Sequence, residues 1–501
     1  MAEYDLTQTL LAYLDPHLGF PLLAHLNTTK LFDAKELAKA QYELAKLTDM
    51  VDFTLQFHRE AFPGEAEPSD VVERGKMLEE KKSKLEKEAE RVLTVIEDPN
   101  VAAQLKQDKA VNMEWLQKNY QLTADQVNVL YDYGRFLFSC GKYKEASSYL
   151  YHYWILSPES KNTESCLWGR LACAILTGEW DRALDDVRLL REHIDAQRTT
   201  APGALGQNTA THEEILQKRV WLLHWSLFVF FNNPTGRVKL VEMYLSPAYL
   251  STMQMSCWWL LRYLVVALIL TRRQATRGFV VDSSGSSQNT KMSTQAALRE
   301  VSKVIQMESY RLRADPFVDF FRYLYVDLDF DHAPEELAKA EKAISTEFFL
   351  RDHATAFMEQ ARLLTTEVYC RIHQNVTVAD LAKRVSQSPD ECEKWLASLA
   401  ADGKTDSKIE FKDGLVRINQ SRPNVYQSVI DKTRGITQRT TTLTQSIERR
   451  ENRVRKTPSR SDNADADVDV DAEAENEADV DAEAEGEMEV DAEAEAKAPA
   501  S

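Results

Sequence analysis

Apolar side chains recur every three to four residues along residues 4–372, which is the spacing of amphipathic helices. Alternating patterns typical of strands are almost absent there. Near the N-terminus, leucine-rich stretches at 10–26 and 37–47 predict short paired helices. A Pro- and Gly-containing segment at 61–70 predicts a loop, and the Glu- and Lys-rich stretch 71–97 predicts a charged helix with a thin apolar stripe. The chain is therefore predicted to be mainly helical.

Part of the helical region repeats itself. Glycine, an aromatic residue and alanine occur together twice, 37 residues apart, as Gly141, Tyr143 and Ala146 and then as Gly178, Trp180 and Ala183. Small residues let two antiparallel helices approach, and aromatic residues fill the space between them, as in tetratricopeptide-like hairpins. Units of this kind bury their apolar faces against neighbouring units, so the repeat predicts a stacked-helix solenoid.

Two strongly apolar stretches are predicted to lie in the core of this solenoid. The first contains Trp221, Leu222, Trp225, Phe228 and Phe231. The second, Cys257–Leu270, is interrupted by Arg262 and is too short to cross a bilayer of about 30 Å, so we expect a buried helix and no membrane contact.

The second half of the solenoid has two polar interruptions. Residues 198–210 and 281–294 are rich in Ser, Thr, Gly, Asn and Gln, and they predict mobile loops between helices. Helical patterns resume at 296–330 and 335–372. The last apolar stripe, which continues into the following segment without a linker, consists of Phe357, Ala361, Leu364, Val368 and Ile372.

Residues 377–418 have the pattern of a winged helix. Thr377 and Asp380 form a capping box for one short helix, and Ser388 with Pro389 starts a second. Alternating residues around Asp413–Gly414 then predict a two-stranded hairpin. The second helix carries Asp390, Glu391, Glu393 and Asp402 against Lys394 alone. Nucleic-acid affinity depends on neutralising phosphates, so this balance favours protein contact and argues against sequence-specific DNA binding.

A long C-terminal helix with a narrow apolar stripe is predicted beyond the wing. The stripe consists of Val425, Val429, Ile436, Leu443 and Ile447, which is typical of association with other helices. The basic tract 449–456 can be a solvated helix end, a localisation signal or an RNA-contact patch. Residues 461–501 hold 17 acids and one lysine, for a charge of -16 out of the chain's -18, and are predicted to be disordered.

The sequence offers no catalytic constellation. The chain lacks the glycine-rich phosphate-binding and Gly-x-Ser-x-Gly motifs, and Gly403–Lys404–Thr405 has Ser398 where a phosphate loop needs glycine. Cys370 and His373 lack the second ligand pair of a zinc site. We therefore expect no enzyme, no cofactor and no metal. Six scattered cysteines favour a reducing compartment, and the start lacks the basic, apolar pattern of a signal peptide. We expect a cytoplasmic location, with a minor nuclear pool.

Taken together, these stretches resemble the PCI-domain family, named for the proteasome lid, the COP9 signalosome and eukaryotic initiation factor 3. The resemblance covers about residues 4–425. Besides the winged helix, it rests on Leu10–Leu26, Leu130–Leu150 and Trp168–Glu192, which are most similar to the initiation factor 3 branch.

The resemblance implies a non-catalytic scaffold subunit of a complex that binds the small ribosomal subunit and promotes recruitment of initiator tRNA and mRNA. It implies that neighbouring subunits join through the winged helix and the C-terminal helix, and that the N-terminal helices recruit a further subunit. The implied interface residues are Lys408, Glu410, Lys412, Val429, Ile436, Leu443 and Ile447. A component of the proteasome lid or signalosome is the nearest alternative, and a nucleic-acid-binding regulator is a more distant one.

The predicted fold is all-α with a small β wing: a right-handed helical-repeat solenoid fused to a winged helix, then a C-terminal helix and an acidic tail. The expected parts, in chain order, are a docking segment at 1–60, the solenoid at 71–345, the PCI winged-helix module at 346–423, the bundle helix at 424–450 and a disordered tail at 451–501.

Overall fold

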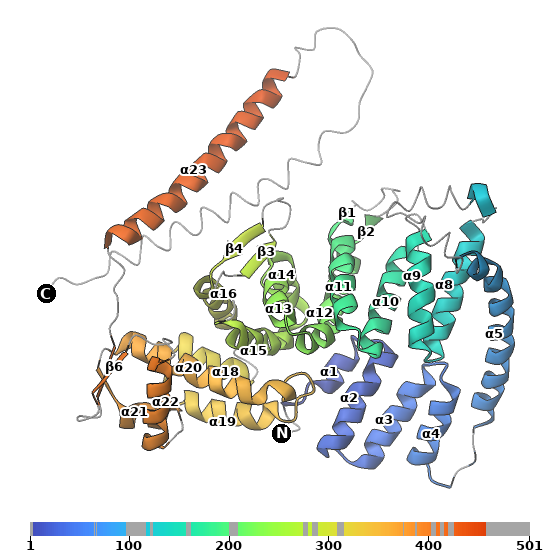
Figure 1. The fold of residues 1–501 in the computed structure, drawn as a ribbon, viewed down its shortest axis with the longest axis horizontal. Coiled ribbons are helices and arrows are strands. Elements are labelled where there is room, and N and C mark those ends of the chain that lie inside the picture. The colour runs from blue at the N-terminus through green and yellow to red at the C-terminus, as the bar shows by residue number, and fades with distance from the viewer. Residues whose placement is uncertain are drawn as a thin grey trace. The chain divides into compact units, whose positions relative to one another are not determined.

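The computed structural model forms two compact units, residues 1–420 and 421–501 (Figure 1). It describes residues 4–64, 66, 68–96, 117–120, 124–156, 162–199, 209–273, 279–282, 289–307, 315–373, 375–385, 388–401, 407–410, 415–418 and 425–456. Within them the chain is mostly helical, with short strands only. Of the predicted tail, residues 457–501 lie outside the described residues.

The N-terminal segment forms the predicted short helices, which lie side by side in Figure 1. They are α1 (Thr7–Leu11), α2 (Pro16–Thr29), α3 (Ala34–Lys46) and α4 (Val51–Ala61), followed by the charged helix α5 (Ser69–Ile96). The Asp15 side chain caps α2 by accepting a hydrogen bond from the His17 backbone N–H at 2.9 Å, and Pro16 occupies the first helical position. On α5, Ala89 and Val92 are fully buried, so the thin apolar stripe faces the core.

The repeated glycines end two helices of the solenoid. The helical pairs are α8 (Ala124–Ser139) with α9 (Tyr143–Leu156), and α10 (Thr163–Thr177) with α11 (Trp180–Asp195). Gly141 and Gly178 have φ angles of +82° and +75°, in the left-handed region that closes a helix at low cost only for glycine. Ala146 and Ala183, on the helices that follow, are both fully buried. The repeat prediction is therefore confirmed.

We expect Gly178→Ala to destabilise the protein by about 1–2 kcal/mol, which is the backbone cost of a side chain at this φ. Among the residues that the structure describes, no atom lies within 4 Å of the added Cβ, so we expect no additional steric cost. Gly141→Ala should cost more, because its Cβ would lie 2.7 Å from the Met50 sulfur. Urea unfolding of the two variants checks the order, and equal losses would contradict the steric argument.

The central core is built from α12 (His212–Asn232), α13 (Gly236–Tyr244), α14 (Pro247–Ser256), η2 (Trp258–Leu260) and α15 (Leu261–Thr271). Every residue of α15 is buried, as predicted for the apolar stretch around Arg262. The prediction for Trp221 is wrong: this side chain is 38% exposed. It lies at the edge of the core, where its ring contacts Trp168 edge-to-face at 6.3 Å.

Among the described residues, no single helix is long and apolar enough to cross a membrane. Two consecutive helices, Pro247–Ser256 and Trp258–Thr271, are together long and apolar enough to span one, but the chain bends by 119° between them.

The prediction of plain loops at 198–210 and 281–294 is wrong at the ends of both segments. Strands β1 (Arg198–Thr199) and β2 (Thr209–Ala210) pair in parallel, and β3 (Phe279–Asp282) pairs antiparallel with β4 (Asn289–Met292). Phe279 is fully buried, which anchors β3 on the core. The backbone N–H of Val280 donates to Glu242 on α13 at 2.9 Å.

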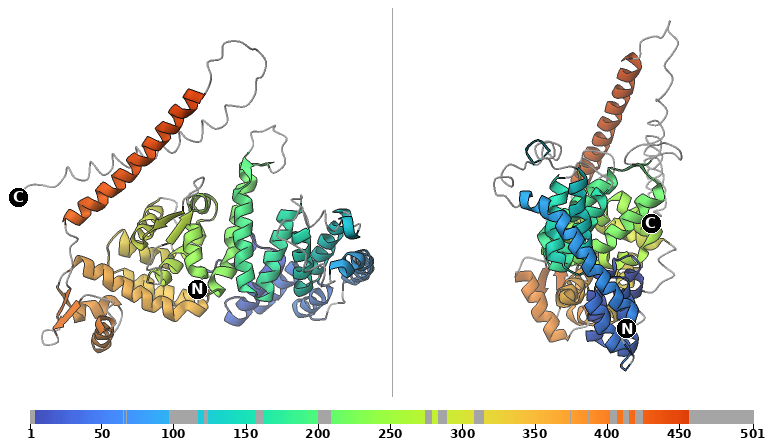
Figure 2. Two further views of the ribbon diagram at one scale, coloured as in Figure 1. Left: turned by 45° about the horizontal axis from the view of Figure 1, so that its top comes forward. Right: turned by 90° about the vertical axis from the view of Figure 1, so that its right-hand side faces the viewer.

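The last helices of the first unit lead directly into the winged helix, which is drawn in darker orange in Figure 2. They are α16 (Thr294–Gln306), α18 (Pro316–Tyr325), α19 (Ala333–Ile344), η3 (Arg351–His353) and α20 (Ala354–Ile372). The predicted stripe on α20 is buried from Phe357 to Val368, but Ile372 is 47% exposed because it lies at the last helical position. One buried cluster extends from Leu10 to Cys392, which confirms that no linker separates solenoid and wing.

Candidate interaction surfaces

The winged helix has one strand more than the sequence pattern predicted. It comprises β5 (Asn375–Thr377), α21 (Val378–Val385), α22 (Pro389–Ala401), β6 (Ser407–Glu410) and β7 (Leu415–Ile418). The sheet order is β5-β7-β6, with both pairs antiparallel. The extra strand escapes pattern analysis because it has three residues, although Val376 and Thr377 are β-branched.

The predicted cap at Thr377 is confirmed, but the Asp380 carboxylate bonds to the Thr377 hydroxyl. The Asp380 backbone N–H donates to the Thr377 hydroxyl at 3.2 Å, while that hydroxyl donates to the Asp380 carboxylate at 2.6 Å. Val378, Leu381 and Val385 are buried on the inner face of α21. Cys392 on α22 is fully buried, whereas Trp395 is only half-buried and packs at the rim of the core.

The module is held against the helices before it. Arg384 on α21 forms an ion pair with Asp331 at 3.1 Å, and its guanidinium lies 4.7 Å from the centre of the Tyr369 ring. These contacts join α21 to the start of α19 and to α20. They orient the wing relative to the end of the solenoid.

The predicted wing residues lie on the hairpin where the structure describes it. Lys408 and Glu410 are on β6, opposite Arg417 and Leu415 of β7. Lys412 lies between the strands, outside the described residues.

The C-terminal helix, α23 (Val425–Lys456), extends past the predicted end at residue 450 and includes the basic tract. Four side chains of the predicted stripe are exposed: Val429, Ile436, Leu443 and Ile447 are 54%, 64%, 55% and 57% exposed. On the next face, threonine hydroxyls donate to backbone carbonyls one turn earlier, as Thr433 does to Val429 at 2.7 Å. An apolar stripe exposed over this length is typical of a helix that packs against partner helices.

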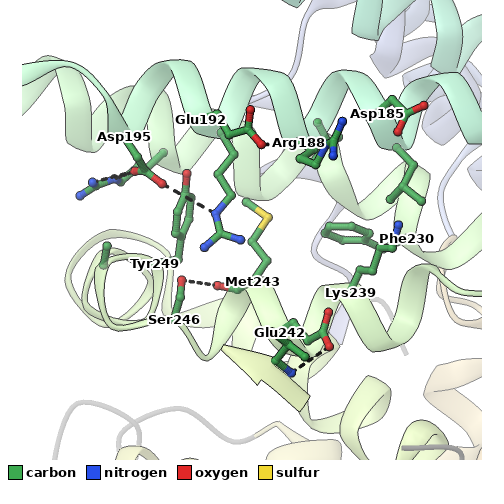
Figure 3. A pocket seen from close by; sticks show the side chains of 16 residues that line it. Asp185, Arg188, Glu192, Asp195, Phe230, Lys239, Glu242, Met243, Ser246 and Tyr249 are labelled. Atoms are coloured by element: carbon green, nitrogen blue, oxygen red, sulfur yellow. Dashed lines mark hydrogen bonds and ion pairs between the residues drawn. The ribbon is translucent and has the colours of Figure 1, made fainter. Parts of the chain in front are cut away.

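A cavity of about 640 Å³ in the first unit lies between α11, α13 and α14 (Figure 3). Asp195 accepts a hydrogen bond from Arg219 at 2.8 Å and pairs with Arg191 at 3.7 Å. The guanidiniums of Arg191 and Arg219 lie 5.2 Å and 5.6 Å from the centre of the Tyr249 ring, which lies between α11 and α14 in the figure. The charges of the cavity are therefore largely paired with one another, as expected for a structural groove.

The lining of this cavity does not bring a serine hydroxyl together with a histidine base. Ser246 lines the same cavity, but its hydroxyl donates to the Met243 carbonyl at 2.7 Å, and no histidine is among the lining residues. No group of three or more His, Cys, Asp or Glu in the described part of the chain is placed to hold a metal ion. His373 instead packs its ring against Tyr369 at 4.5 Å.

A second groove lies between α9 and α11, and two of its lining residues, Arg170 and Asp186, form a buried ion pair. Arg170 donates to Asp186 at 2.6 Å, with the two side chains 8% and 3% exposed. The Arg170 guanidinium also lies 4.7 Å from the centre of the Trp154 ring. Burial outweighs the neighbouring Arg170 charge and raises the pKa of Asp186 from 3.8 to about 6.

This pKa predicts how stability depends on pH. Between pH of about 4 and about 6 the folded state holds a proton at Asp186 that the unfolded chain has lost, so stability falls as pH rises. We expect Asp186→Asn to lack this pH-dependent contribution to stability, because an amide does not titrate in this range. The difference in free energy of unfolding, wild type minus variant, should decrease across this window and be constant above it. Denaturant titrations at several pH values check this, and parallel pH profiles would contradict it.

Two family models match separate parts of the chain. Residues 5–137 match the N-terminal domain of initiation factor 3 subunit 6, and residues 337–420 match the PCI domain. The second range begins within α19 and includes α20 and the winged helix described above. A relative from Mycosarcoma maydis, named as the E subunit of eukaryotic translation initiation factor 3, is 48% identical, over 89% of this chain and 86% of its own length. The chain belongs to the family of this initiation factor 3 subunit.

Further relatives with the same name are 38% identical. The one from Aspergillus clavatus is matched over 88% of this chain and 92% of its own length, and the one from Aspergillus niger over 89% and 93%. The family membership confirms the initiation factor 3 branch of the predicted resemblance. The other PCI branches, of the proteasome lid and the signalosome, are not the family to which this chain belongs.

Proposed function

We propose that this chain is a non-catalytic scaffold subunit of eukaryotic translation initiation factor 3, a complex that binds the small ribosomal subunit and promotes recruitment of initiator tRNA and mRNA. The observation that carries the proposal is the 48% identity to an initiation factor 3 subunit over most of both chains. The exposed apolar stripe of α23 supports it, because a stripe of this length needs partner helices to cover it.

The scaffold has two proposed contact regions for neighbouring subunits. One is the winged helix, with Lys408, Glu410 and Lys412 at the wing, where a sheet edge and charged side chains can pair with another module. The other is α23, whose stripe contributes Val429, Ile436, Leu443 and Ile447 to a helical bundle. A single stripe buried among several helices would supply the apolar area that a stable interface needs.

A third proposed contact lies at residues 4–60. Aromatic side chains of α2 and α4 gather there, with the Phe20 and Phe57 rings stacked at 5.9 Å and Phe53 52% exposed. Exposed aromatic residues of this kind commonly anchor protein interfaces. We propose that a further subunit of the complex docks on them. We place the working complex in the cytoplasm, with a minor nuclear pool.

The decisive experiment is quantitative mass spectrometry of proteins that co-purify with the tagged full-length chain at physiological salt. The proposal expects the other initiation factor 3 subunits in near-equal amounts, together with small-subunit ribosomal proteins. Recovery of proteasome-lid or signalosome subunits in their place would overturn it. A chain lacking residues 461–501 should recover the same subunits, since the proposed contacts all lie before the tail.

A further inference from the structure

A pocket of about 370 Å³ in the first unit lies between α2, the end of α12 and the segment that leads into η3. Its apolar lining consists of Phe231, Phe348 and Phe349, and its polar lining includes the imidazole of His25. His25 lies about 140° around α2 from Phe20, so it is on a different face from the exposed aromatic side chains of α2 and α4. A volume of this size, with mostly apolar walls and a few polar groups, is typical of a binding pocket.

The aromatic rings of the lining contact one another edge-to-face. Phe348 and Phe349 have centroids 5.0 Å apart, and Phe349 makes a similar contact with Phe228 on α12 at 4.9 Å. Phe231 and Phe349 are buried, whereas Phe348 is half-buried and its ring meets His25 edge-to-face at 5.5 Å. Aromatic rings prefer edge-to-face and offset-stacked neighbours, so a further flat ring fits this lining.

The two imidazoles at the pocket differ in their hydrogen bonds. His353 donates from Nε2 to the Phe231 carbonyl at 3.1 Å and accepts at Nδ1 from the Arg237 guanidinium, 3.0 Å away. Among the residues that the structure describes, the buried His25 Nε2 has no hydrogen-bond partner. Burial, together with the Arg351 charge, lowers the pKa of His25, so its imidazole is neutral at pH 7 and has one acceptor nitrogen. The ring torsion of histidine is broad, so His25 can turn this nitrogen toward a donor in the pocket.

The core of the same chain shows which group satisfies an imidazole among aromatic rings. His224 accepts the indole N–H of Trp259 at Nε2, over 3.0 Å, and the Tyr13 ring stacks on the same imidazole at 4.6 Å. An indole combines a flat ring with a single N–H donor. In the pocket beside α2, it would supply a ring for Phe348 and a donor for His25.

The charges at the pocket do not favour a nucleic-acid base. Arg351 and Asp352 are the charged residues among those that line it, and both are exposed. Their charges cancel, whereas a nucleotide needs cations that neutralise its phosphate. A polypeptide has no such requirement, and tryptophan is among the residues most enriched at the centres of protein interfaces.

We propose that this pocket binds a tryptophan side chain of a partner polypeptide, with the indole N–H donated to His25 and the ring packed against Phe348. Phe231 and Phe349 provide the buried apolar lining. The site is additional to the wing, to α23 and to the aromatic side chains of α2 and α4, and it does not depend on which complex the chain joins.

Fluorine NMR of N-acetyl-tryptophanamide, with fluorine on the indole ring, tests the pocket in the full chain. We expect saturable binding with a dissociation constant of about 0.1–1 mM, as for other ligands of this size. The analogue that is methylated at the indole nitrogen should bind about fivefold more weakly, because it has no N–H to donate. No saturable binding, or equal binding of the two probes to the wild-type chain, would overturn the proposal.

Three variants locate the binding. Phe348→Ala should weaken both probes at least tenfold. His25→Phe keeps an aromatic ring but removes the acceptor, so it should bind the two probes equally. Phe53→Ala, at an exposed aromatic residue of α4 outside this pocket, should bind them as the wild type does. Thermal unfolding confirms that each variant is folded. Unchanged binding in folded Phe348→Ala would overturn the proposal.

Photo-cross-linking in cells tests the partner. A benzoylphenylalanine replaces Asn232, which is exposed and lines the pocket, and the control replaces exposed Lys35 on α3. We expect position 232 to cross-link to a tryptophan-containing segment of another protein, and position 35 not to do so. Changing that tryptophan to leucine, or Phe348→Ala in this chain, should remove the cross-link. Cross-links that are mainly to RNA or to this chain itself, or that survive the loss of the tryptophan, would overturn the proposal.

Discussion

Ile436→Asp combined with Leu443→Asp should release the chain from its complex while its own helical content is retained. Both side chains are more than half exposed in this chain, so an aspartate there removes no internal packing and costs only helix propensity, about 0.5 kcal/mol each. In a bundle, each carboxylate would lose hydration without gaining a partner. A loss of about 3 kcal/mol or more weakens association at least a hundredfold. Co-purification of the neighbouring subunits, with circular dichroism of the isolated chain, measures both effects.

The matched control places the same two charges on the opposite face of α23. Thr441→Asp with Gln445→Asp lies about 160° from the stripe, and both positions are exposed. This variant should co-purify with its neighbours at wild-type levels. If the stripe variant also does so, the apolar stripe is not an interface and the scaffold proposal loses its main structural support. Equal losses in both variants would indicate that the helix itself has failed.

Regular periodicity made much of the fold predictable. The glycines at 141 and 178 each end a helix, and Ala146 and Ala183 are buried behind them, because a repeat imposes the same local geometry twice. The regular spacing of apolar residues also predicted the two helices of the winged helix and its two-stranded hairpin. The exposed stripe of α23 follows from four- and seven-residue steps that no neighbouring segment interrupts.

The failures lie where structure depends on distant partners. Strand β5 is three residues long and exists through pairing with β7, about forty residues later. Trp221 and Ile372 belong to apolar patterns whose other residues are mostly buried, but both side chains lie at the edge of the core and are partly exposed to solvent. Which edge of an apolar pattern faces solvent is decided by helices far away in sequence, so local spacing cannot predict it.

Arg262 is the clearest case of this kind. In the sequence it only interrupts an apolar stretch, yet in the structure its side chain is 3% exposed and holds two acids from distant segments. Arg262 lies 2.8 Å from Asp315 and 3.3 Å from Glu347, and it donates to the Tyr4 carbonyl at 2.9 Å. Tyr263 donates its hydroxyl to the same Glu347. Burial raises the pKa of Glu347, against the opposing influence of the Arg262 charge.

Arg262→Met should therefore destabilise the first unit by about 3–5 kcal/mol, because it leaves two buried carboxylates without their cation. Arg188→Met, the same substitution at an exposed pair 4.0 Å from Glu192, should change stability by less than about 1 kcal/mol. Loss of the cation removes the influence that opposes the raised pKa of Glu347, so the defect should be larger at pH 8 than at pH 5, where protonation of Glu347 removes a buried charge. Urea unfolding of both variants at the two pH values measures these differences.

Because Arg262 also donates a hydrogen bond to the Tyr4 carbonyl, limited proteolysis should find the N-terminal residues cleaved faster in Arg262→Met than in Arg188→Met. A loss no larger than that of Arg188→Met would show that the buried pairs do not hold these segments together.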